Sequence, residues 1–200
     1  MRAEMSSNLT MEDEALVRRC QEGDQEAFRT LVTRYHGRVF HLIHGLVGDR
    51  DDADDLAQEV FIKAFRALSR FERRAQFYTW LYRIAVNQCL DWLKTRGRSV
   101  ETPLGRLSLT RADTLAAKSS AGADSETHQH ELGRALEKAL TTLSPDYRAA
   151  LTLREEEGLT YEEIAEVMGC SVGTVKSRLF RGRLLLQRAL ADIYEDWKGA

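Results

Sequence analysis

The chain has few of the residues that anchor or crosslink extracellular and membrane proteins. Its 200 residues include only two prolines and three cysteines, Cys20, Cys89 and Cys170. The cysteines form no CxxC pair and no even set, which argues against a disulfide framework. No apolar run approaches the roughly 20 residues of a membrane span, and the first 13 residues are polar where a signal peptide needs an apolar stretch. We therefore expect a reduced, cytoplasmic protein without membrane insertion.

The sequence also lacks the motifs of common enzymes. It has no glycine-rich phosphate loop, no GxSxG and no metal-ligand helix, so we predict no catalytic residues and no cofactor. His41 and His44 lie about one turn apart, and Cys20 completes a set that a metal or redox sensor could use. Structural zinc usually has four ligands in tight local pairs, so this scattered set favours no metal site.

Charge is unevenly distributed along the chain, although the net charge is only −2. Residues 49–59 hold six acidic side chains and a single arginine. Residues 63–98 hold nine Lys or Arg against two acidic residues, and residues 171–188 hold five against none. The pattern indicates two basic surfaces next to acidic or neutral ones.

The apolar residues recur every three or four positions, which predicts an all-α fold. One amphipathic helix begins near Asp24, and further stripes follow up to about residue 98. The periodicity then fails over a stretch rich in Ser, Thr, Ala and Gly, and resumes at about residue 130. We predict two small helical domains, residues 12–98 and 130–193, that dock separately on a larger partner and are joined by a flexible linker, residues 99–129.

The second domain contains a helix-turn-helix pattern. Thr160 and Glu163 form a capping box before a short helix at 161–168, Gly169 to Ser171 break and recap the chain, and a longer helix runs from Val172 to about Leu190. Its apolar stripe leaves a basic face outward, where we expect Ser177 and Arg181 to read bases. A basic helix face is often only solvated surface, but its coincidence with the capped turn favours DNA binding. The candidate DNA-binding residues are Thr174, Lys176, Ser177, Arg178, Arg181 and Arg183.

Two segments of the first domain make the assignment more specific. Residues 54–65 and 77–87 closely resemble region 2 of bacterial RNA polymerase sigma factors, and residues 161–183 resemble their region 4. The two-domain form resembles the extracytoplasmic-function (ECF) class, near the sigma-E type. This resemblance implies a subunit that binds core RNA polymerase and directs promoter-specific initiation in a stress or envelope response.

The same resemblance implies roles for particular residues. The helix that carries Asp54, Asp55, Gln58 and Glu59 would dock on the β′ clamp helices of polymerase, where opposite charge steers association, and region 4 would contact the β flap. The segment 77–98 would hold the −10 strand, after a loop at 71–76 that helps to form a pocket for an extruded base. We expect Trp80 to be core. The resemblance also implies an anti-sigma factor as a partner and −35 recognition by the second domain. The −10 candidates are Tyr78, Tyr82, Arg83, Asn87, Lys94 and Arg96.

The alternative is a helix-turn-helix transcriptional regulator that acts without being a polymerase subunit. Response regulators of this kind carry an α/β receiver or a ligand-sensing domain before the DNA-binding domain, whereas no segment of the first block alternates as a strand would. A sigma factor binds promoter DNA poorly alone, so DNA binding without polymerase discriminates between the two.

Overall fold

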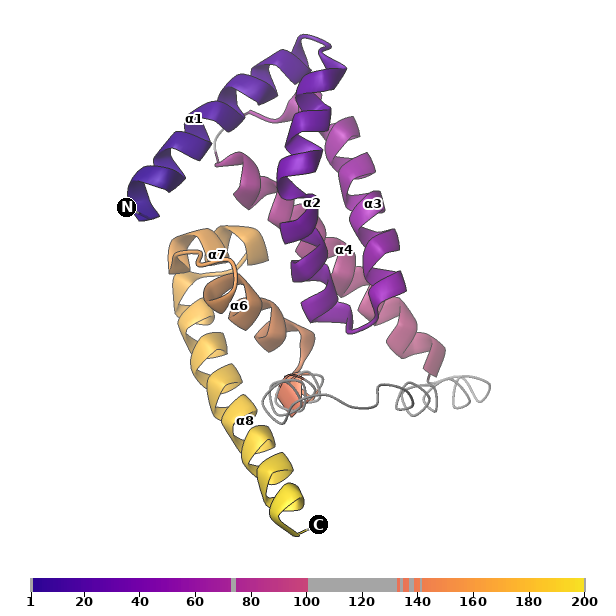
Figure 1. Ribbon diagram of the computed structural model, residues 1–200, viewed down its shortest axis with the longest axis vertical. Coiled ribbons are helices and arrows are strands. Elements are labelled where there is room, and N and C mark those ends of the chain that lie inside the picture. Colours follow the sequence, from indigo (N-terminus) through magenta and orange to yellow (C-terminus); the bar gives the residue numbers. More distant parts are fainter. Residues whose placement is uncertain are drawn as a thin grey trace, which may run out of the picture.

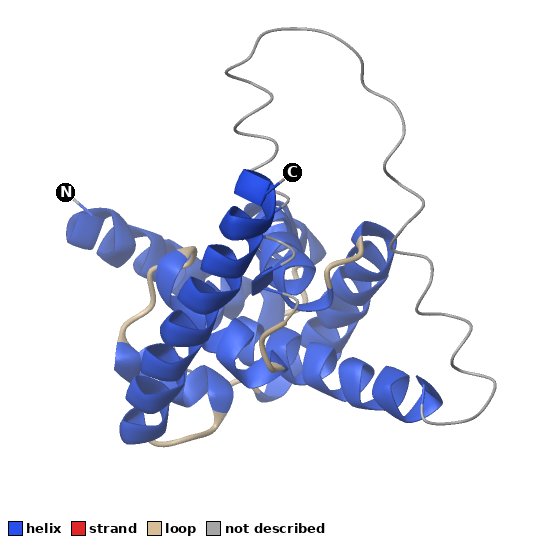
Figure 2. Cartoon of the chain, turned by 90° about the horizontal axis from the view of Figure 1, so that it is seen from below, coloured by secondary structure: helices blue, strands red, loops and turns tan. Residues whose placement is uncertain are grey.

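The computed structural model describes residues 2–72, residues 75–100, and residues 133–199 apart from 134, 137, 138 and 141. Over these residues every regular element is a helix, which confirms the all-α prediction (Figure 2). None of the helices in this part of the chain is both long and apolar enough to cross a membrane.

Four helices and one 3-10 turn make up the first group, and local capping explains where they begin. The Asp24 side chain accepts hydrogen bonds from the backbone N–H groups of Glu26 and Ala27, and Asp49 caps the next helix in the same way. Gly48 adopts a left-handed φ of 79° between these two helices, a conformation that favours glycine. The elements are α1 (Arg2–Gln21), α2 (Gln25–Val47), α3 (Arg50–Ala67), η1 (Leu68–Arg70) and α4 (Phe77–Val100).

Polar side chains attach α1 to the rest of this group. Asp13 is buried and accepts a hydrogen bond from Arg34 of α2 at 2.6 Å and another from Tyr35. Burial, together with the Asp13 carboxylate, raises the pKa of Tyr35. At the other end of α1, Gln21 Nε2 donates to the carbonyl oxygens of Leu68 and Phe71, both at 3.0 Å. These bonds hold the chain at the end of α3 and the start of the following loop.

The second group holds α6 (Pro145–Glu155), α7 (Tyr161–Met168) and α8 (Val172–Gly199), and the described residues from 133 to 140 are also helical. Pro145 occupies the first turn of α6, where its missing backbone N–H has no helical partner to lose. Helix α8 continues to Gly199, past the predicted end near Leu190. Of the predicted linker, residues 99 and 100 end α4, whereas 101–129 lie outside the described residues.

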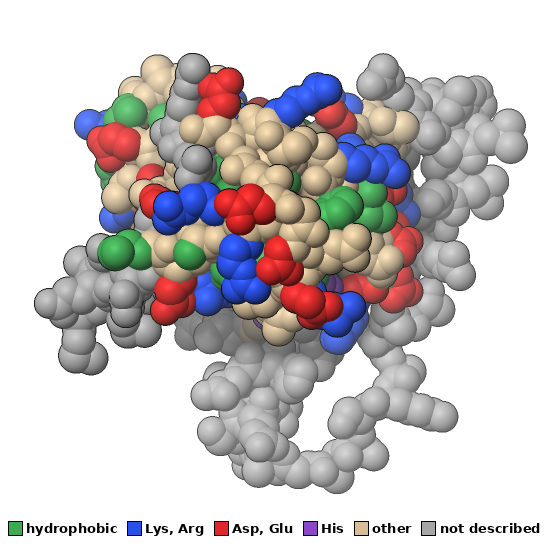
Figure 3. All heavy atoms as spheres, turned by 90° about the horizontal axis from the view of Figure 1, so that it is seen from above, with side chains coloured by type: hydrophobic (Ala, Val, Ile, Leu, Met, Phe, Trp, Pro, Cys, Tyr) green, Lys and Arg blue, Asp and Glu red, His purple; other side chains and the backbone are tan. Residues whose placement is uncertain are grey.

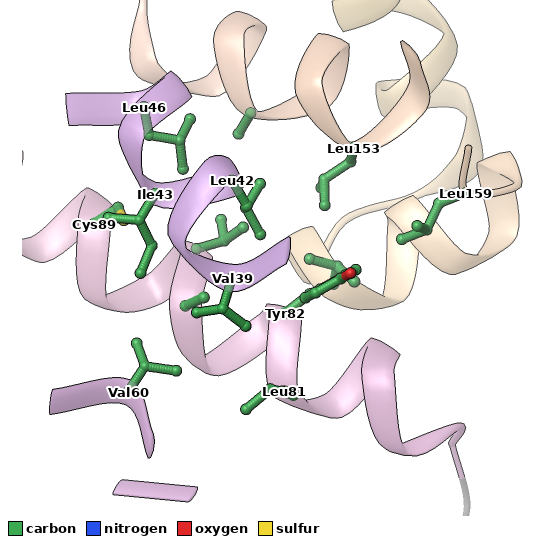
Figure 4. Close-up of a cluster of buried hydrophobic side chains, with 14 of the residues drawn as sticks. Val39, Leu42, Ile43, Leu46, Val60, Leu81, Tyr82, Cys89, Leu153 and Leu159 are labelled. Carbon is green, nitrogen blue, oxygen red and sulfur yellow. The ribbon is translucent and has the colours of Figure 1, made fainter. Parts of the chain in front are cut away.

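The two helical groups pack against each other. Helix α4 contacts α7, and α2 contacts α6 (Figure 1). One hydrophobic core continues across both groups, so that Leu42 and Tyr82 of the first lie near Leu153 and Leu159 of the second (Figure 4). Helical periodicity marks which face of each helix is apolar but does not say which distant helix covers it.

Candidate nucleic-acid interface

Helices α7 and α8 form the predicted helix-turn-helix. The Thr160 side chain accepts from the backbone N–H of Glu163 while the Glu163 side chain accepts from the Thr160 N–H, so the capping box is present. Gly169 ends α7 with a φ of 60°. Ser171 Oγ then accepts from the Thr174 N–H at 3.1 Å, which starts α8. The local sequence therefore sets the angle at which α8 leaves the turn.

The buried stripe of α8 packs against α6. Val175 and Leu179 are fully buried, and Gly182 lies so close to α6 that an added Cβ would come within 3.1 Å of Leu151 Cδ1. The glycine thus lets α8 approach α6 closely. The opposite face is exposed at Lys176, Ser177, Arg181, Arg183 and Arg188.

The predicted DNA-binding residues of α8 differ in their partners. Arg178 is only 22% exposed and pairs with Asp146 at 3.0 Å and with Cys170 Sγ at 3.5 Å. Arg183 pairs with Glu155 at 2.6 Å, and this carboxylate raises the pKa of Arg183. Arg181 is exposed and pairs with no acidic side chain of the described residues. Lys176 and Arg188 are likewise exposed, and neither pairs with an acidic side chain in the described part of the chain.

Helix α4 divides the −10 candidates between two environments. Arg83, Asn87 and Lys94 are exposed at helical spacing. By contrast, Tyr78 is half-buried and Tyr82 fully buried, and both hydroxyls donate to glutamates of the second group.

Two further aromatic residues of α4 have local partners. The Arg96 guanidinium lies 4.5 Å from the centre of the Trp92 ring and pairs with Asp52 of α3. Trp80 is partly buried against the core beside Phe71, as expected.

The acidic face of α3 is exposed and is continuous with an apolar patch that the sequence analysis missed. Asp54, Asp55, Gln58 and Glu59 are all exposed, and Gln58 donates to Asp54 at 3.1 Å. Within the next two turns, Ile62 and Phe65 are each 51% exposed. Both fall outside the buried stripe of α3, so periodicity could have identified them. An apolar patch beside a charged one is typical of a protein-binding surface.

Charge elsewhere is mixed. Figure 3 views the end of the molecule where α1 joins α2, and acidic and basic side chains are interspersed on this face. The described side chains on this face form no patch of a single sign that would suit DNA binding.

A metal-sensor reading gains no support from the structure. Over the described ranges, no three His, Cys, Asp or Glu side chains are grouped as a metal ion requires. His44 instead stacks on Phe40, with ring centres 5.9 Å apart.

Known families match both helical groups. Residues 31–99 match sigma-70 region 2, and residues 133–186 match sigma-70 region 4. A sigma-70-type transcription initiation factor is thus the class that the fold defines. A helix-turn-helix regulator acting without polymerase is not favoured, because the match extends over region 2.

Similar proteins show which kind of sigma-70-type factor this chain is. The chain is 43% identical over 183 residues to the ECF RNA polymerase sigma-E factor of Escherichia coli K12, covering 90% of this chain and 93% of the relative. It is 42% identical over 193 residues to the RNA polymerase sigma-H factor of Pseudomonas aeruginosa, covering 94% and 99%. The chain therefore belongs to the ECF sigma factors, and it is a sigma factor that directs transcription.

Two solved structures share the fold over both helical groups. One is the sigma factor RpoE of Bartonella quintana in complex with the anti-sigma factor NepR, with a TM-score of 0.65 and 29% identity, covering 82% of this chain and 96% of that one. The other is CnrH in complex with the cytosolic domain of CnrY, with a TM-score of 0.64 and 25% identity, covering 90% and 98%.

Proposed function

We propose that this sigma factor binds core RNA polymerase through α3 and reads two promoter elements, the −10 element with α4 and the −35 element with α8. The observation that carries the proposal is the division of charge between exposed helix faces. The face of α3 is acidic, whereas α4 and α8 present basic side chains at helical spacing. These are the charges expected for docking on a protein and for contact with phosphates.

For the −35 element, α8 is the recognition helix. Ser177 and Arg181 lie on its outward face, where serine and arginine hydrogen-bond base edges in the major groove. Thr174, Lys176 and Arg183 lie beside them and meet phosphates. Arg178, paired with Asp146, acts by positioning α8 on the rest of region 4.

For the −10 element, the exposed row of Arg83, Asn87 and Lys94 follows the separated strand, while Arg96 stays near the Trp92 ring. Tyr78 and Tyr82 supply rings on which unpaired bases stack, provided that the second helical group leaves them. The loop at 71–76 contributes to a pocket for an extruded base.

For polymerase, Asp54, Asp55, Gln58 and Glu59 contact the β′ clamp helices, and Ile62 and Phe65 extend that surface. A second contact with the β flap uses the apolar groove of α7 and α8, where Phe180 is 70% exposed beside Leu184. Apolar side chains rimmed by charges suit such an interface.

The chain acts in the cytoplasm by binding and not by catalysis. RpoE of Bartonella quintana is in complex with an anti-sigma factor, which supports an anti-sigma factor as a regulatory partner of this chain. Control by such a partner fits a response to envelope or other stress. Co-purification from unstressed native cells tests for the anti-sigma factor, and the absence of a stoichiometric partner would count against this part of the proposal.

Run-off transcription tests the main proposal. Core polymerase with this chain should initiate at a subset of a pool of genomic promoter fragments, and core alone should not. Failure to initiate at any promoter would contradict the proposal. Asn87→Ala should lower initiation and impair strand opening detected by permanganate, whereas Thr33→Ala, at an exposed position of α2, is the matched control.

A further inference from the structure

Glu157 connects the two helical groups. It lies in the turn between α6 and α7, and its side chain is only 6% exposed. Arg38 of α2 donates to its carboxylate from Nε at 3.0 Å and from Nη2 at 2.9 Å, and the Tyr82 hydroxyl of α4 donates to the same group. A buried carboxylate needs such partners to offset lost hydration. The Glu157 carboxylate therefore exchanges water for Arg38 and Tyr82 when the two groups pack together.

A second bond repeats this arrangement along α4. The Tyr78 hydroxyl donates to Glu163, which also accepts from the Thr160 N–H at 2.7 Å. Burial and the Glu163 carboxylate raise the pKa of Tyr78 to about 12. Burial alone would raise the pKa of Glu163, but the hydrogen bonds from Tyr78 and Thr160 lower it. At neutral pH the phenol remains a donor and the carboxylate an acceptor.

Helices α2 and α6 close the other side of the interface. The buried Arg148 of α6 donates to the Leu46 carbonyl oxygen at 2.6 Å, at the C-terminal end of α2. A Cβ on Gly45 would lie 3.4 Å from Thr152 Oγ1, so the two helices approach closely here. In Figure 4 the Tyr82 ring points from α4 toward Leu153 and Leu159. The interface is thus packed and hydrogen-bonded along its length.

This arrangement is incompatible with reading two promoter elements at once. The −10 and −35 elements are about 25 base pairs apart, or about 85 Å at roughly 3.4 Å per step. Helices α4 and α7 are in direct contact. The 32 residues from 101 to 132 are long enough to bridge such a distance, because an extended chain spans about 3.3 Å per residue. The groups must separate before both elements are bound.

We propose that the contacts of Glu157 and Glu163 with Arg38, Tyr82 and Tyr78 form an intramolecular latch that keeps the free sigma factor closed and withholds the two tyrosines from DNA. The inference rests on the proposed −10 role of α4. It requires no partner protein, because the latch consists of residues of this chain. Apparent affinity for single-stranded DNA then falls with the fraction of open molecules.

A steric wedge tests the latch. Gly45→Leu places a branched side chain against Thr152, whereas Gly37→Leu makes the same change in the same helix where no atom lies within 4 Å of the added Cβ. Small-angle X-ray scattering of the full chain should give a larger radius of gyration for Gly45→Leu than for the wild type, and no change for Gly37→Leu. Equal radii for the two variants would overturn the proposal.

A second pair of variants guards against misfolding of the wedge. Glu157→Ala removes the shared carboxylate, and Glu166→Ala removes an exposed glutamate of the same helical group as a control. Only Glu157→Ala should expand the chain, with helical circular dichroism retained. If the wild type is open about 10% of the time, full opening raises its affinity for a labelled random-sequence single-stranded DNA about tenfold. Expansion of Glu157→Ala without tighter binding of single-stranded DNA would support the contact as a latch but would contradict the −10 role of α4.

A disulfide across the interface provides the converse test. The double variant is Gly45→Cys with Thr152→Cys. Thr152 Oγ1 lies 3.4 Å from the position of a Cβ at residue 45, and the introduced sulfur at position 152 would replace this oxygen. This separation is compatible with a disulfide bond. The oxidised protein should lose run-off transcription with core polymerase and regain it on reduction. Equal transcription in both redox states, with the bridge verified by mass spectrometry, would refute closure as an inactive state.

Discussion

The Tyr78 hydroxyl donates a hydrogen bond to Glu163, a residue 85 positions later that also caps the first helix of the helix-turn-helix. The same glutamate therefore serves the local fold of region 4 and the contact between regions 2 and 4. Tyr82 and Glu157 repeat this relationship across 75 positions. Both tyrosines are candidates for holding the −10 strand, so closing the molecule and binding DNA compete for the same side chains.

Alkaline pH should weaken the fold through Tyr78. Its pKa is raised from 10.0 to about 12, so between these values the folded state retains a proton that the unfolded state has lost. The stabilisation is complete below pH 10 and disappears as the pH rises through 12. Urea denaturation at a series of pH values should show this fall, and Tyr78→Phe should make it shallower. An unchanged slope in Tyr78→Phe would show that Glu163 does not hold the phenol.

Replacing Arg181 by alanine should weaken −35 recognition. Loss of a base contact costs about 1–3 kcal/mol and relaxes specificity at one position. Promoter binding by the holoenzyme is the measurement, with substitutions in the −35 element scanned in parallel. The control is Arg29→Ala, which removes an exposed arginine from α2 instead of α8. A loss that is uniform over all −35 sequences would instead make Arg181 a phosphate contact.

The first residue of a helix could be predicted from the sequence to within one residue where a side-chain cap sets it. Asp24 starts α2, and Thr160 with Glu163 starts α7, because the partners lie two or three residues away. The burial of Tyr82 was not predictable in this way. Its partner Glu157 comes from a different helical group, and helical spacing alone is equally consistent with a ring exposed for stacking.

Two glycines should respond oppositely to larger side chains. Gly37 lies in the exposed middle of α2 with open space around its Cβ position, so Gly37→Ala should stabilise the protein by about 0.5–1 kcal/mol. Gly182→Val should destabilise it by roughly 1–3 kcal/mol, because Leu151 leaves no space for the added methyl groups. Thermal unfolding of both variants checks the signs. A stabilised Gly182→Val would mean that α6 and α8 separate at little cost.

The three cysteines should differ in reactivity. Cys89 is fully buried, and burial raises its pKa to about 12, so little thiolate is available in the folded protein. Iodoacetamide at about pH 8 should label Cys20 and Cys170, which are partly exposed, well before Cys89. Peptide mass spectrometry gives the order, and labelling in urea is the control. Rapid labelling of Cys89 under native conditions would indicate that α4 separates frequently from the core.

Reversing charge on α3 should slow docking on polymerase. Asp55 and Glu59 are exposed on the acidic face, and charges at the rim of an interface act mainly on the association rate. Asp55→Lys with Glu59→Lys should lower the association rate with core polymerase by about tenfold at low salt, with a smaller difference at high salt. The control is Glu14→Lys on α1, which makes the same change in net charge as either α3 substitution alone but lies away from this face. Docking on polymerase precedes promoter contact, so the slower association should be measurable with core polymerase in the absence of DNA. An equal loss in the control would assign the effect to overall charge and not to the α3 surface.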